Sequence, residues 1–346
     1  MKVHLVAQVQ GNFGDELNRW LWPGLLADVW SKADDGVLFV GIGTVLDGNL
    51  PEARVTIVFG TGTGYTPAPP DVSARWRIYG VRGPLTARAL NLDKRFAMTD
   101  PAILLATLSE FSGLDRHGVI FVPHWKSVRY GDWQRICKTL GIEFVDPCQD
   151  SKLVVRRIAA AEKVIAESMH AAIIADAFRV PWIPVALSRE ISPFKWVDWA
   201  SSLDVAYRPV CLPPSNRIER LRNVMLMGTA YWNATDYPSS SEVARGASMH
   251  FEDVDRLLSN FEEIGRRVNQ QWRVNASIGL EAALKRLARV GLGSDERMLN
   301  AATERLGKLT SSDGFLSSDQ AHAHLLNDTL SRLEVFRGDV RGGAFS

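Results

Sequence analysis

The feature that most constrains this chain is a strand, helix, strand pattern in its middle. The apolar run Lys163–Ala166 predicts a buried parallel strand, small helix-forming residues follow as far as Phe178, and residues 180–187 supply a second strand. A unit of this kind is typical of α/β folds with a parallel sheet. Ser168 is then the expected helix N-cap. His170 falls in the first helical turn, at the carboxyl end of a strand, where open α/β sheets bind ligands.

His170 is therefore a candidate functional residue. A histidine in this position can contact an anion and can exchange a proton near neutral pH. The alternative is a structural histidine at a helix start, which is the commoner use of an isolated Ser-x-His pattern. The other motifs of the chain are needed to decide between the two.

The first third of the chain repeats the alternation of apolar runs and helical segments. Strands are predicted at residues 3–7, 37–40, 55–59, 77–81 and 96–98, and helices at residues 15–30 and 84–90. Several strands are followed by polar turns, namely Gly11-Asn12-Phe13-Gly14-Asp15, Gly41-Ile42-Gly43-Thr44, Gly60-Thr61-Gly62-Thr63-Gly64 and Arg82-Gly83-Pro84. These turns are expected at one edge of one sheet. None is a complete dinucleotide fingerprint or phosphate loop, so each alone is more simply a tight turn.

A second α/β unit begins near Gly118. Strands are predicted at residues 119–122 and 142–145, and helices at residues 132–140 and 151–161, before the strand, helix, strand unit completes it. The fold class predicted is α/β, with two doubly wound Rossmann-like domains facing a cleft. The domains are expected at residues 1–108 and 115–215, joined by a linker within residues 108–117.

The chain changes character after residue 215. Apolar residues recur at helical spacing in residues 251–268 and 280–290, and further helix is predicted at residues 306–309 and 325–336. Residues 216–346 are thus expected to form a helical C-terminal region. Its apolar stripes predict packing on the α/β body or on a partner chain.

Composition limits the classes of function. The 346 residues are 46% apolar and 23% charged with a net charge of +1, as in ordinary globular proteins. A charge this close to neutral argues against a dedicated nucleic-acid binder. The three cysteines lack paired metal-ligand spacing, and no metal site is predicted. No stretch has the length of a signal peptide's apolar region or a membrane span, so a cytoplasmic location is expected.

Four motifs, taken together, resemble the polysaccharide pyruvyltransferase family, and most closely its exopolysaccharide branch of the succinoglycan type. They are Gly11-Asn12-Phe13-Gly14-Asp15-Glu16-Leu17-Asn18, Val81-Arg82-Gly83-Pro84-Leu85-Thr86, Thr99-Asp100-Pro101-Ala102 and Glu167-Ser168-Met169-His170-Ala171. The segment Lys195-Trp196-Val197-Asp198-Trp199 also resembles that branch. The order and spacing of the motifs carry the resemblance, which covers residues 1–215.

The resemblance implies a reaction and a fold. Members transfer a pyruvyl group from phosphoenolpyruvate to two hydroxyls of one sugar, forming a cyclic ketal and releasing phosphate. They are similar in fold to two-domain glycosyltransferases of the B type, with the donor in the interdomain cleft. The partners implied are phosphoenolpyruvate, as a substrate rather than a cofactor, and a saccharide acceptor. A lipid-linked acceptor, peripheral membrane association and a homo-oligomer stay open.

The chemistry makes its own demands on residues. Phosphoenolpyruvate carries a carboxylate and a phosphate, so its site needs fixed cations, and arginine can bind either group in a bidentate fork. The enol methylene must also be protonated, which requires a general acid. Arg82, beside a helix that Pro84 is expected to begin, is the predicted anion anchor, with pairing to a carboxylate as its alternative. His170 is the predicted general acid.

Seven further residues are candidates for substrate binding: Asn12, Asp15, Arg88, His124, Lys126, Glu167 and Ser168. Each has a simpler alternative. Asp15 can orient an acceptor hydroxyl or cap the helix that it begins, and Glu167 can orient a cation or only neutralise it. Solvated surface positions explain Arg88 and the basic loop that carries His124 nearly as well. Trp196 and Trp199 can stack on a sugar, but core packing is the commoner use of tryptophan.

Two other functions fit the same sequence. A B-type glycosyltransferase that uses a nucleotide sugar would have the same fold, and fold alone does not decide function. The second is a non-catalytic glycan-binding or assembly protein, in which the helical C-terminal region carries the activity. The presence of both Arg82 and His170 argues against it.

Overall fold

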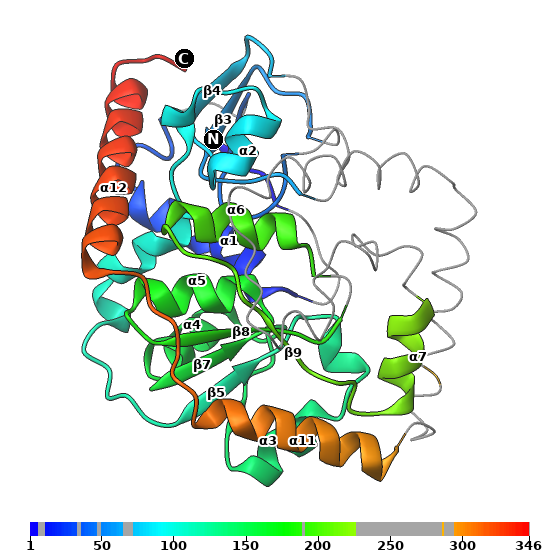
Figure 1. Ribbon diagram of the computed structural model, residues 1–346. Coiled ribbons are helices and arrows are strands. Elements are labelled where there is room, and N and C mark those ends of the chain that lie inside the picture. Colours follow the sequence, from blue (N-terminus) through cyan, green and yellow to red (C-terminus); the bar gives the residue numbers. More distant parts are fainter. Residues whose placement is uncertain are drawn as a thin grey trace.

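The computed structural model describes residues 1–5, 11–32, 36–46, 50–64, 72–188, 191–225, 286 and 294–345. It contains two parallel β-sheets with helices packed around them (Figure 1). The α/β class predicted from the sequence is therefore confirmed.

Among the described residues, the N-terminal sheet holds four strands in chain order: β1 (Lys2–Val3), β2 (Val37–Val40), β3 (Val55–Phe59) and β4 (Trp76–Gly80). β2 is buried along its whole length, as expected for a strand of a parallel sheet covered on both faces. The strand predicted at residues 96–98 is wrong, because only one isolated bridge forms there, between Val81 and Ala97. The end of the strand predicted at residues 3–7 lies outside the described residues.

The described part of this half also forms two α-helices and three short 3-10 helices. α1 (Phe13–Leu25) has Asn12 at its N-cap position, so it begins earlier than predicted. α2 (Pro84–Ala89) begins with Pro84, as predicted. The 3-10 helices are η1 (Lys94–Phe96), η2 (Pro101–Thr107) and η3 (Ser109–Phe111).

The second sheet has the strand order β6-β5-β7-β8-β9. Its strands are β5 (Val119–Val122), β6 (Glu143–Phe144), β7 (Lys163–Ala166), β8 (Trp182–Ala186) and β9 (Val210–Cys211). The chain passes from β5 to β6 on one side and then places β7 on the other side of β5. Open α/β sheets bind ligands at such a switch point, beyond the carboxyl ends of the strands. The described part of the N-terminal sheet has no such reversal.

The helices of the second half are α3 (Trp133–Leu140), α4 (Ser151–Ala159), α5 (Met169–Ala177), α6 (Pro193–Ser202) and α7 (Arg217–Met225), with the short η4 (Ser127–Arg129). α3, α4 and α5 lie where helices were predicted. α6 was not predicted as a helix, although Pro193 in its first turn is a start signal.

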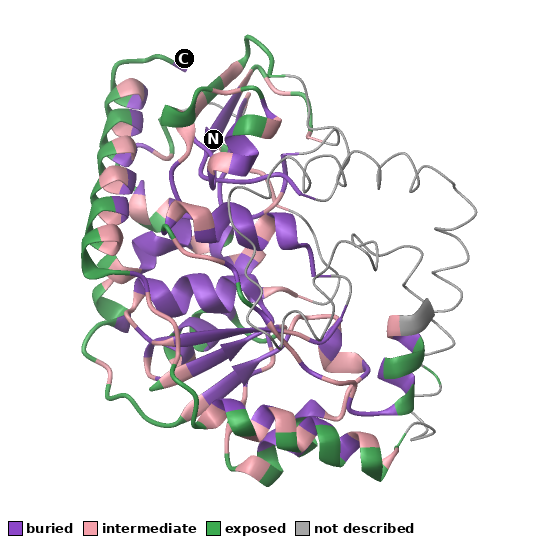
Figure 2. Cartoon of the chain, viewed as in Figure 1, coloured by how far each residue is buried: buried purple, intermediate pink, exposed green. Residues whose placement is uncertain are grey.

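Helices α1, α5 and α6 lie between the two sheets (Figure 1), and Figure 2 shows that this layer is largely buried. A single hydrophobic cluster includes side chains from both halves, such as Phe13 and Phe59 from the first and Val164 and Trp199 from the second. The two halves therefore share one apolar core. The domain boundaries at residues 108 and 115 stay predictions.

The C-terminal helices pack on the α/β body, as their apolar spacing predicted. α11 (Glu296–Thr310) contributes Leu299 and Leu306 to a cluster with Trp133 of α3. The predicted helices at residues 251–268 and 280–290 lie outside the described residues, apart from Arg286.

α12 (Asp319–Arg341) follows the loop that pairs with β8, and then runs back to the N-terminal sheet (Figure 1). Its Phe336 ring lies 5.5 Å from the ring of Phe39 and 5.2 Å from that of Tyr79, measured between centroids. Arg332 donates hydrogen bonds to the carbonyl oxygens of Tyr79 and Arg95. α12 thus packs against β2 and β4 of the N-terminal sheet.

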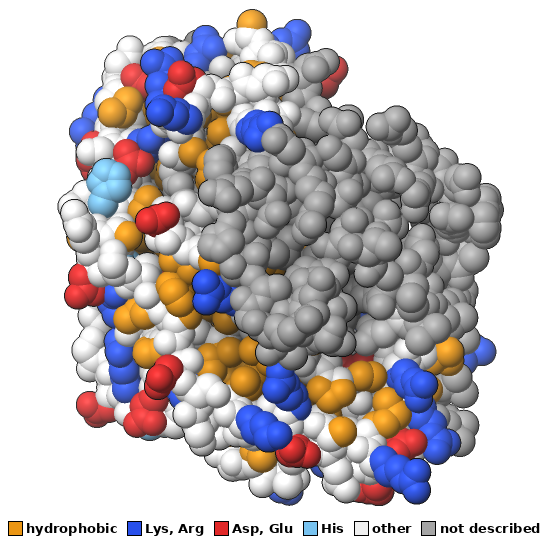
Figure 3. Space-filling view, in the orientation of Figure 1, with side chains coloured by type: hydrophobic (Ala, Val, Ile, Leu, Met, Phe, Trp, Pro, Cys, Tyr) orange, Lys and Arg blue, Asp and Glu red, His pale blue; other side chains and the backbone are white. Residues whose placement is uncertain are grey.

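On the face shown in Figure 3, basic and acidic side chains are interspersed over the described part, and hydrophobic side chains gather near its centre. Within the ranges that the structure describes, no helix has both the length and the apolar character needed to cross a bilayer.

The packing of α12 predicts a sharp contrast between two neighbouring residues. Phe336 is fully buried, whereas Val335 is 60% exposed. Phe336→Ala should lower the free energy of unfolding by about 3–5 kcal/mol, because it leaves a cavity beside Phe39. Val335→Ala is the matched control and should change it by less than about 0.5 kcal/mol. Urea unfolding of both variants measures the difference, and equal effects would contradict this packing.

Candidate active site

Six ionisable side chains gather where the loops after the strands of both sheets meet. We call this group the ionic cluster: Asp15, Arg82, Asp100, His170, Lys195 and Asp198. Its members interact electrostatically, since Lys195 acts on the pKa of Asp15, Asp100 and His170. The predicted catalytic pair, Arg82 and His170, thus lies in one environment.

Arg82 is fully buried and its guanidinium donates to four protein acceptors. Nε lies 3.1 Å from Oδ2 of Asp198, and Nη1 lies 2.7 Å from Oγ1 of Thr44. The carbonyl oxygens of Gly43 and Thr63 accept the other two bonds. Because a guanidinium has five N–H groups, most of the capacity of Arg82 is used within the protein. The alternative of carboxylate pairing is therefore realised, although in the core and not on the surface.

Asp198 joins α6 to the start of α2. Its Oδ1 accepts from the backbone N–H of Thr86 at 2.9 Å, and its Oδ2 accepts from the Thr86 hydroxyl at 2.6 Å as well as from Arg82. A Cβ at Gly83 would lie 2.1 Å from the carbonyl oxygen of Asp198. Only glycine allows this approach, so the Arg82-Gly83-Pro84 turn is explained by the contact with α6.

The other glycine-rich turns also face the cluster. A Cβ at Gly62 would lie 2.3 Å from Nη2 of Arg82, and one at Gly64 would lie 2.8 Å from Cγ of Lys195. Gly14 would place its Cβ 1.9 Å from Nδ1 of His170. These glycines make room for the side chains of Arg82, Lys195 and His170, so the glycine motifs are part of the site.

His170 lies in the first turn of α5, and its ring meets Phe13 edge-on at 6.4 Å between centroids. Burial, reinforced by the positive charges of Lys195 and Arg82, lowers the pKa of His170 to about 3. The imidazole is therefore neutral at pH 7 in this arrangement. The sequence predicted proton exchange near neutral pH for this residue, and burial together with the two cations holds its pKa below that range.

Asp100 is fully buried beside it, and its Oδ1 accepts from the backbone N–H of Ala102 at 3.0 Å. Burial raises the pKa of Asp100 to about 6, although the Ala102 N–H and the charge of Arg82 act in the opposite direction. Its proton therefore exchanges close to physiological pH.

Lys195, near the start of α6, is half-buried. Burial and the charge of Arg82 lower the pKa of its ammonium to about 7, against the opposing effects of Asp15 and Asp100. A lysine with this pKa can both donate and accept a proton at neutral pH. The sequence analysis named Lys195 only as part of the segment Lys195–Trp199 and did not predict a role for its side chain. The available signal was a lone cation in an apolar segment between Phe194 and Trp196.

Asn12 and Asp15 meet the cluster from α1. Nδ2 of Asn12 donates to Oδ2 of Asp15 at 2.8 Å. Burial raises the pKa of Asp15, and the charge of Lys195 partly offsets this effect. Asp15 does not cap α1, because Asn12 occupies the N-cap position.

The Glu167 side chain accepts hydrogen bonds from the backbone that follows two strands, β5 and β8. Its Oε2 accepts from the backbone N–H of His124, after β5, at 2.8 Å, and its Oε1 accepts from that of Leu187, after β8, at 3.2 Å. Burial raises its pKa to about 7. The Glu167 carboxyl group therefore holds the backbone at His124 and Leu187 in place. Neither of these hydrogen bonds is the predicted contact with a cation.

The loop after β5 adds cations to the region. Burial, followed by the charges of Lys195, Lys126 and Arg222, holds the pKa of His124 well below its usual range. The Lys126 ammonium lies 5.3 Å from the centroid of the Trp125 ring. Because His124 responds to Lys195, this loop faces the same electrostatic environment as the ionic cluster.

The remaining candidates lie apart or make simpler contacts. Arg88 is exposed in the last turn of α2. Ser168 is the N-cap residue of α5, as predicted, but its side chain makes no capping hydrogen bond. Trp196 and Trp199 are each 2% exposed and belong to the core, so a sugar-stacking role for them is wrong. Within the described ranges, no three histidine, cysteine, aspartate or glutamate side chains are grouped to hold a metal ion.

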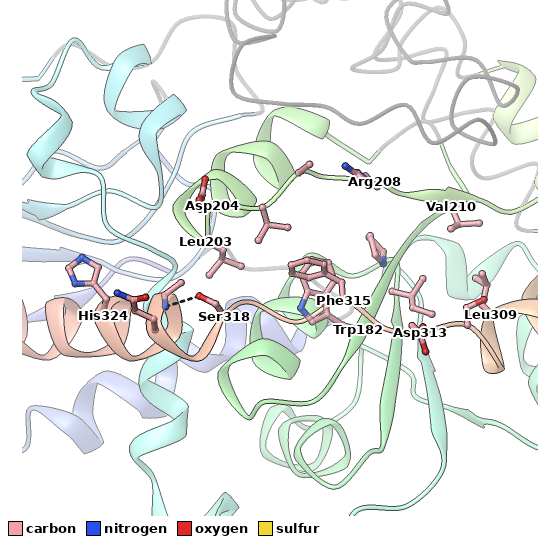
Figure 4. Close-up of a pocket in the computed structure, with 17 residues that line it drawn as sticks. Trp182, Leu203, Asp204, Arg208, Val210, Leu309, Asp313, Phe315, Ser318 and His324 are labelled. Atoms are coloured by element: carbon pink, nitrogen blue, oxygen red, sulfur yellow. Dashed lines mark hydrogen bonds between the residues drawn. The ribbon is translucent and has the colours of Figure 1, made fainter.

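A separate cavity of about 910 Å³ lies between the segment before β9 and the loop from α11 to α12 (Figure 4). Its floor includes Trp182 at the start of β8, and Asp204 and Asp313 lie on opposite walls. The site of His170 follows the carboxyl end of β7, a strand parallel to β8. The cavity is therefore at the opposite end of the sheet, and no member of the ionic cluster lines it.

Comparisons with known proteins place the chain in a family. The family model for polysaccharide pyruvyl transferase matches residues 37–189, which include Arg82, Asp100 and His170. The chain belongs to the polysaccharide pyruvyl transferase family and is thus an enzyme, which sets aside the non-catalytic alternative.

One relative is the succinoglycan biosynthesis protein ExoV of Rhizobium meliloti (strain 1021). It is 44% identical over 236 residues, which are 67% of this chain and 73% of the relative. No solved structure matches the chain significantly.

The burial of the Arg82–Asp198 pair predicts a large stability effect. Asp198→Ala should lower the free energy of unfolding by about 3–5 kcal/mol, because it leaves the Arg82 guanidinium buried without its counter-ion. Glu304→Ala, which removes an exposed ion pair with Lys308, is the control and should cost less than about 1 kcal/mol. Chemical denaturation compares the two, and a small loss for Asp198→Ala would mean that Arg82 is not held as described.

Proposed function

We propose that this enzyme transfers the pyruvyl group of phosphoenolpyruvate to two hydroxyls of one sugar of an exopolysaccharide or lipid-linked oligosaccharide. The product is a cyclic ketal and phosphate is released. The ionic cluster is the observation that carries the proposal. It combines two cations, Arg82 and Lys195, with the carboxyl group of Asp100, and the pKa values of Lys195 and Asp100 are about 7 and about 6.

The proton balance explains why such groups are needed. The donor C2–C3 double bond becomes a methyl group when C3 takes up a proton, and C2 then forms bonds to two sugar oxygens while its bond to the phosphate oxygen breaks. The two hydroxyl protons end on the methyl group and on the released phosphate. Proton exchange in both directions at neutral pH therefore suits this reaction.

The roles we propose follow from the contacts. Lys195 binds the donor anion, and Arg82 adds charge and positions α2 and α6 through Asp198. His170 transfers the proton to C3 after the negative groups of the donor have raised its pKa. Asn12, Asp15, His124, Lys126, Arg88, Glu167 and Ser168 support substrate binding directly or through the backbone.

The setting of the reaction is also part of the proposal. We place the donor in a cleft between the two α/β halves, as in B-type glycosyltransferases, in a cytoplasmic enzyme that needs no cofactor. A lipid-linked acceptor would bring the enzyme to a membrane surface, and a homo-oligomer is compatible with the proposal. The switch point at β5 supports this position of the site.

The direct test is phosphate release from phosphoenolpyruvate with candidate lipid-linked oligosaccharides, coupled to a mass gain on the glycan. His170→Ala should reduce turnover by about 10²- to 10⁴-fold while it retains much of the donor affinity. Thermal shift against phosphoenolpyruvate and a panel of nucleotide sugars separates the proposal from glycosyl transfer. Stabilisation by nucleotide sugars alone would reject the pyruvyl donor.

The pKa of Lys195 predicts how donor affinity depends on pH. The ammonium is charged below about pH 7 and becomes neutral above it. Since the donor binds the charged form, its Kd should rise with pH by up to about tenfold per unit between roughly pH 7.5 and 9. Lys195→Arg keeps its charge and should flatten this dependence. Binding titrations over this range measure both proteins, and an equally steep rise in Lys195→Arg would exclude Lys195 as the titrating group.

A further inference from the structure

Two buried polar atoms in the site face each other without hydrogen-bond partners. They are Oδ2 of Asp100 and Nε2 of His170, which lie 3.9 Å apart. This distance is within reach of an ion pair but about 1 Å too long for an N–H···O hydrogen bond. Buried polar atoms are nearly always satisfied in proteins, so a facing pair of unsatisfied atoms points to a function.

The carboxyl group of Asp100 has a fixed orientation. Its Oδ1 accepts from the backbone N–H of Ala102 and caps η2, and the residue is fully buried. Oδ2 is therefore the oxygen directed at His170. Loss of the Oδ1 contact would be needed to turn it away.

The imidazole of His170 is held as well. Phe13 packs against its ring, and Gly14 lies so close that a Cβ there would collide with Nδ1. His170 retains 8% exposure although Nε2 is buried. Since Nε2 faces Asp100, a proton can pass between the ring and a substrate through Nδ1, which lies beside Gly14.

We propose that Asp100 is the positioning residue of His170: its carboxylate accepts the Nε2 proton and thereby assigns proton exchange with the substrates to Nδ1. The proposal rests on the proposed function for its role in turnover. The assigned proton position itself is a property of the protein alone.

The surrounding charges show why such a carboxylate is needed. Arg82 and Lys195 both face His170 and disfavour an imidazolium, while Asp198 acts on Asp100. An anionic donor offsets the two cations, and Asp100 then stabilises the charge that develops on the ring. Asp100 thus supplies a negative neighbour on the Nε2 side of the imidazolium.

The transfer begins with protonation of the donor. Protonated His170 gives its Nδ1 proton to C3 of the donor, where the electron pair of the double bond forms the new C–H bond. The first sugar hydroxyl adds to the cationic C2, and its proton returns to Nδ1. The second hydroxyl then replaces the phosphate at C2, and the proton of that hydroxyl leaves on the phosphate. Asp100 holds the Nε2 proton throughout and undergoes no net change.

Asp100→Asn tests the assignment with little change in shape. The amide oxygen can still accept from Ala102, so the amide nitrogen must face Nε2 and offer it a donor. His170 would then carry its proton on Nδ1, the wrong nitrogen. We expect kcat to fall by about 10²- to 10⁴-fold while the Kd for phosphoenolpyruvate changes by less than about threefold.

The spectroscopic test needs no turnover. Nitrogen-15 NMR of the histidine rings, with His170 assigned from the spectrum of His170→Gln, should show an Nε2–H tautomer in the natural protein and an Nδ1–H tautomer in Asp100→Asn. Asp93→Asn is the matched control, because Asp93 caps η1 through the N–H of Arg95 on the exposed surface. It should change neither the tautomer nor kcat.

An Nδ1–H tautomer in the natural protein would overturn the proposal, even if Asp100→Asn did not fold. So would a folded Asp100→Asn protein with unchanged tautomer or with kcat within about threefold of the natural value. If phosphoenolpyruvate gives no phosphate with any acceptor, the proposed function fails, whereas the tautomer result still decides the role of Asp100.

Discussion

The buried ion pair between Arg82 and Asp198 is the interaction on which the site depends. Arg82 follows β4 of the N-terminal sheet, whereas Asp198 belongs to α6, which lies between β8 and β9 of the second sheet in the chain. Removing both charges from water costs free energy, and the pair is tolerated because Thr44, Thr63 and Thr86 complete its hydrogen bonds. The pair thereby fixes the loops of both halves against each other.

The same burial gives the site its chemical character. Low solvent access disfavours every charged form, so it lowers the pKa of Lys195 and His170 and raises that of Asp100. The pKa values of these groups therefore lie near or below neutral pH. A pyruvyl transferase must move protons to and from its substrates in this pH range. The glycines of the motifs are the condition for this burial, since side chains at Gly14, Gly62 or Gly83 would collide with members of the cluster.

Much of the fold could be read from the sequence, because continuous apolar runs mark buried parallel strands whatever their partners. Residues 37–40 and 119–122 are strands at the predicted bounds. Residues 96–98 were wrongly predicted as a strand, because an apolar run does not show whether a partner strand pairs with it, and only one bridge forms there. The helix α6 was not predicted, although Pro193 marks its start. The motifs also located Arg82 and His170, but the roles of Lys195 and Asp198 depend on partners far away in the chain. The neutral state of His170 is likewise set by neighbouring charges that no local pattern reveals.

The central claim is that the ionic cluster binds the donor of a pyruvyl transferase. A crystal structure of the protein with phosphoenolpyruvate tests it most directly. We expect a donor anion within hydrogen-bond distance of Nζ of Lys195, and C3 of the donor next to Nδ1 of His170. Donor density in the cavity floored by Trp182, with the ionic cluster unchanged, would contradict the account.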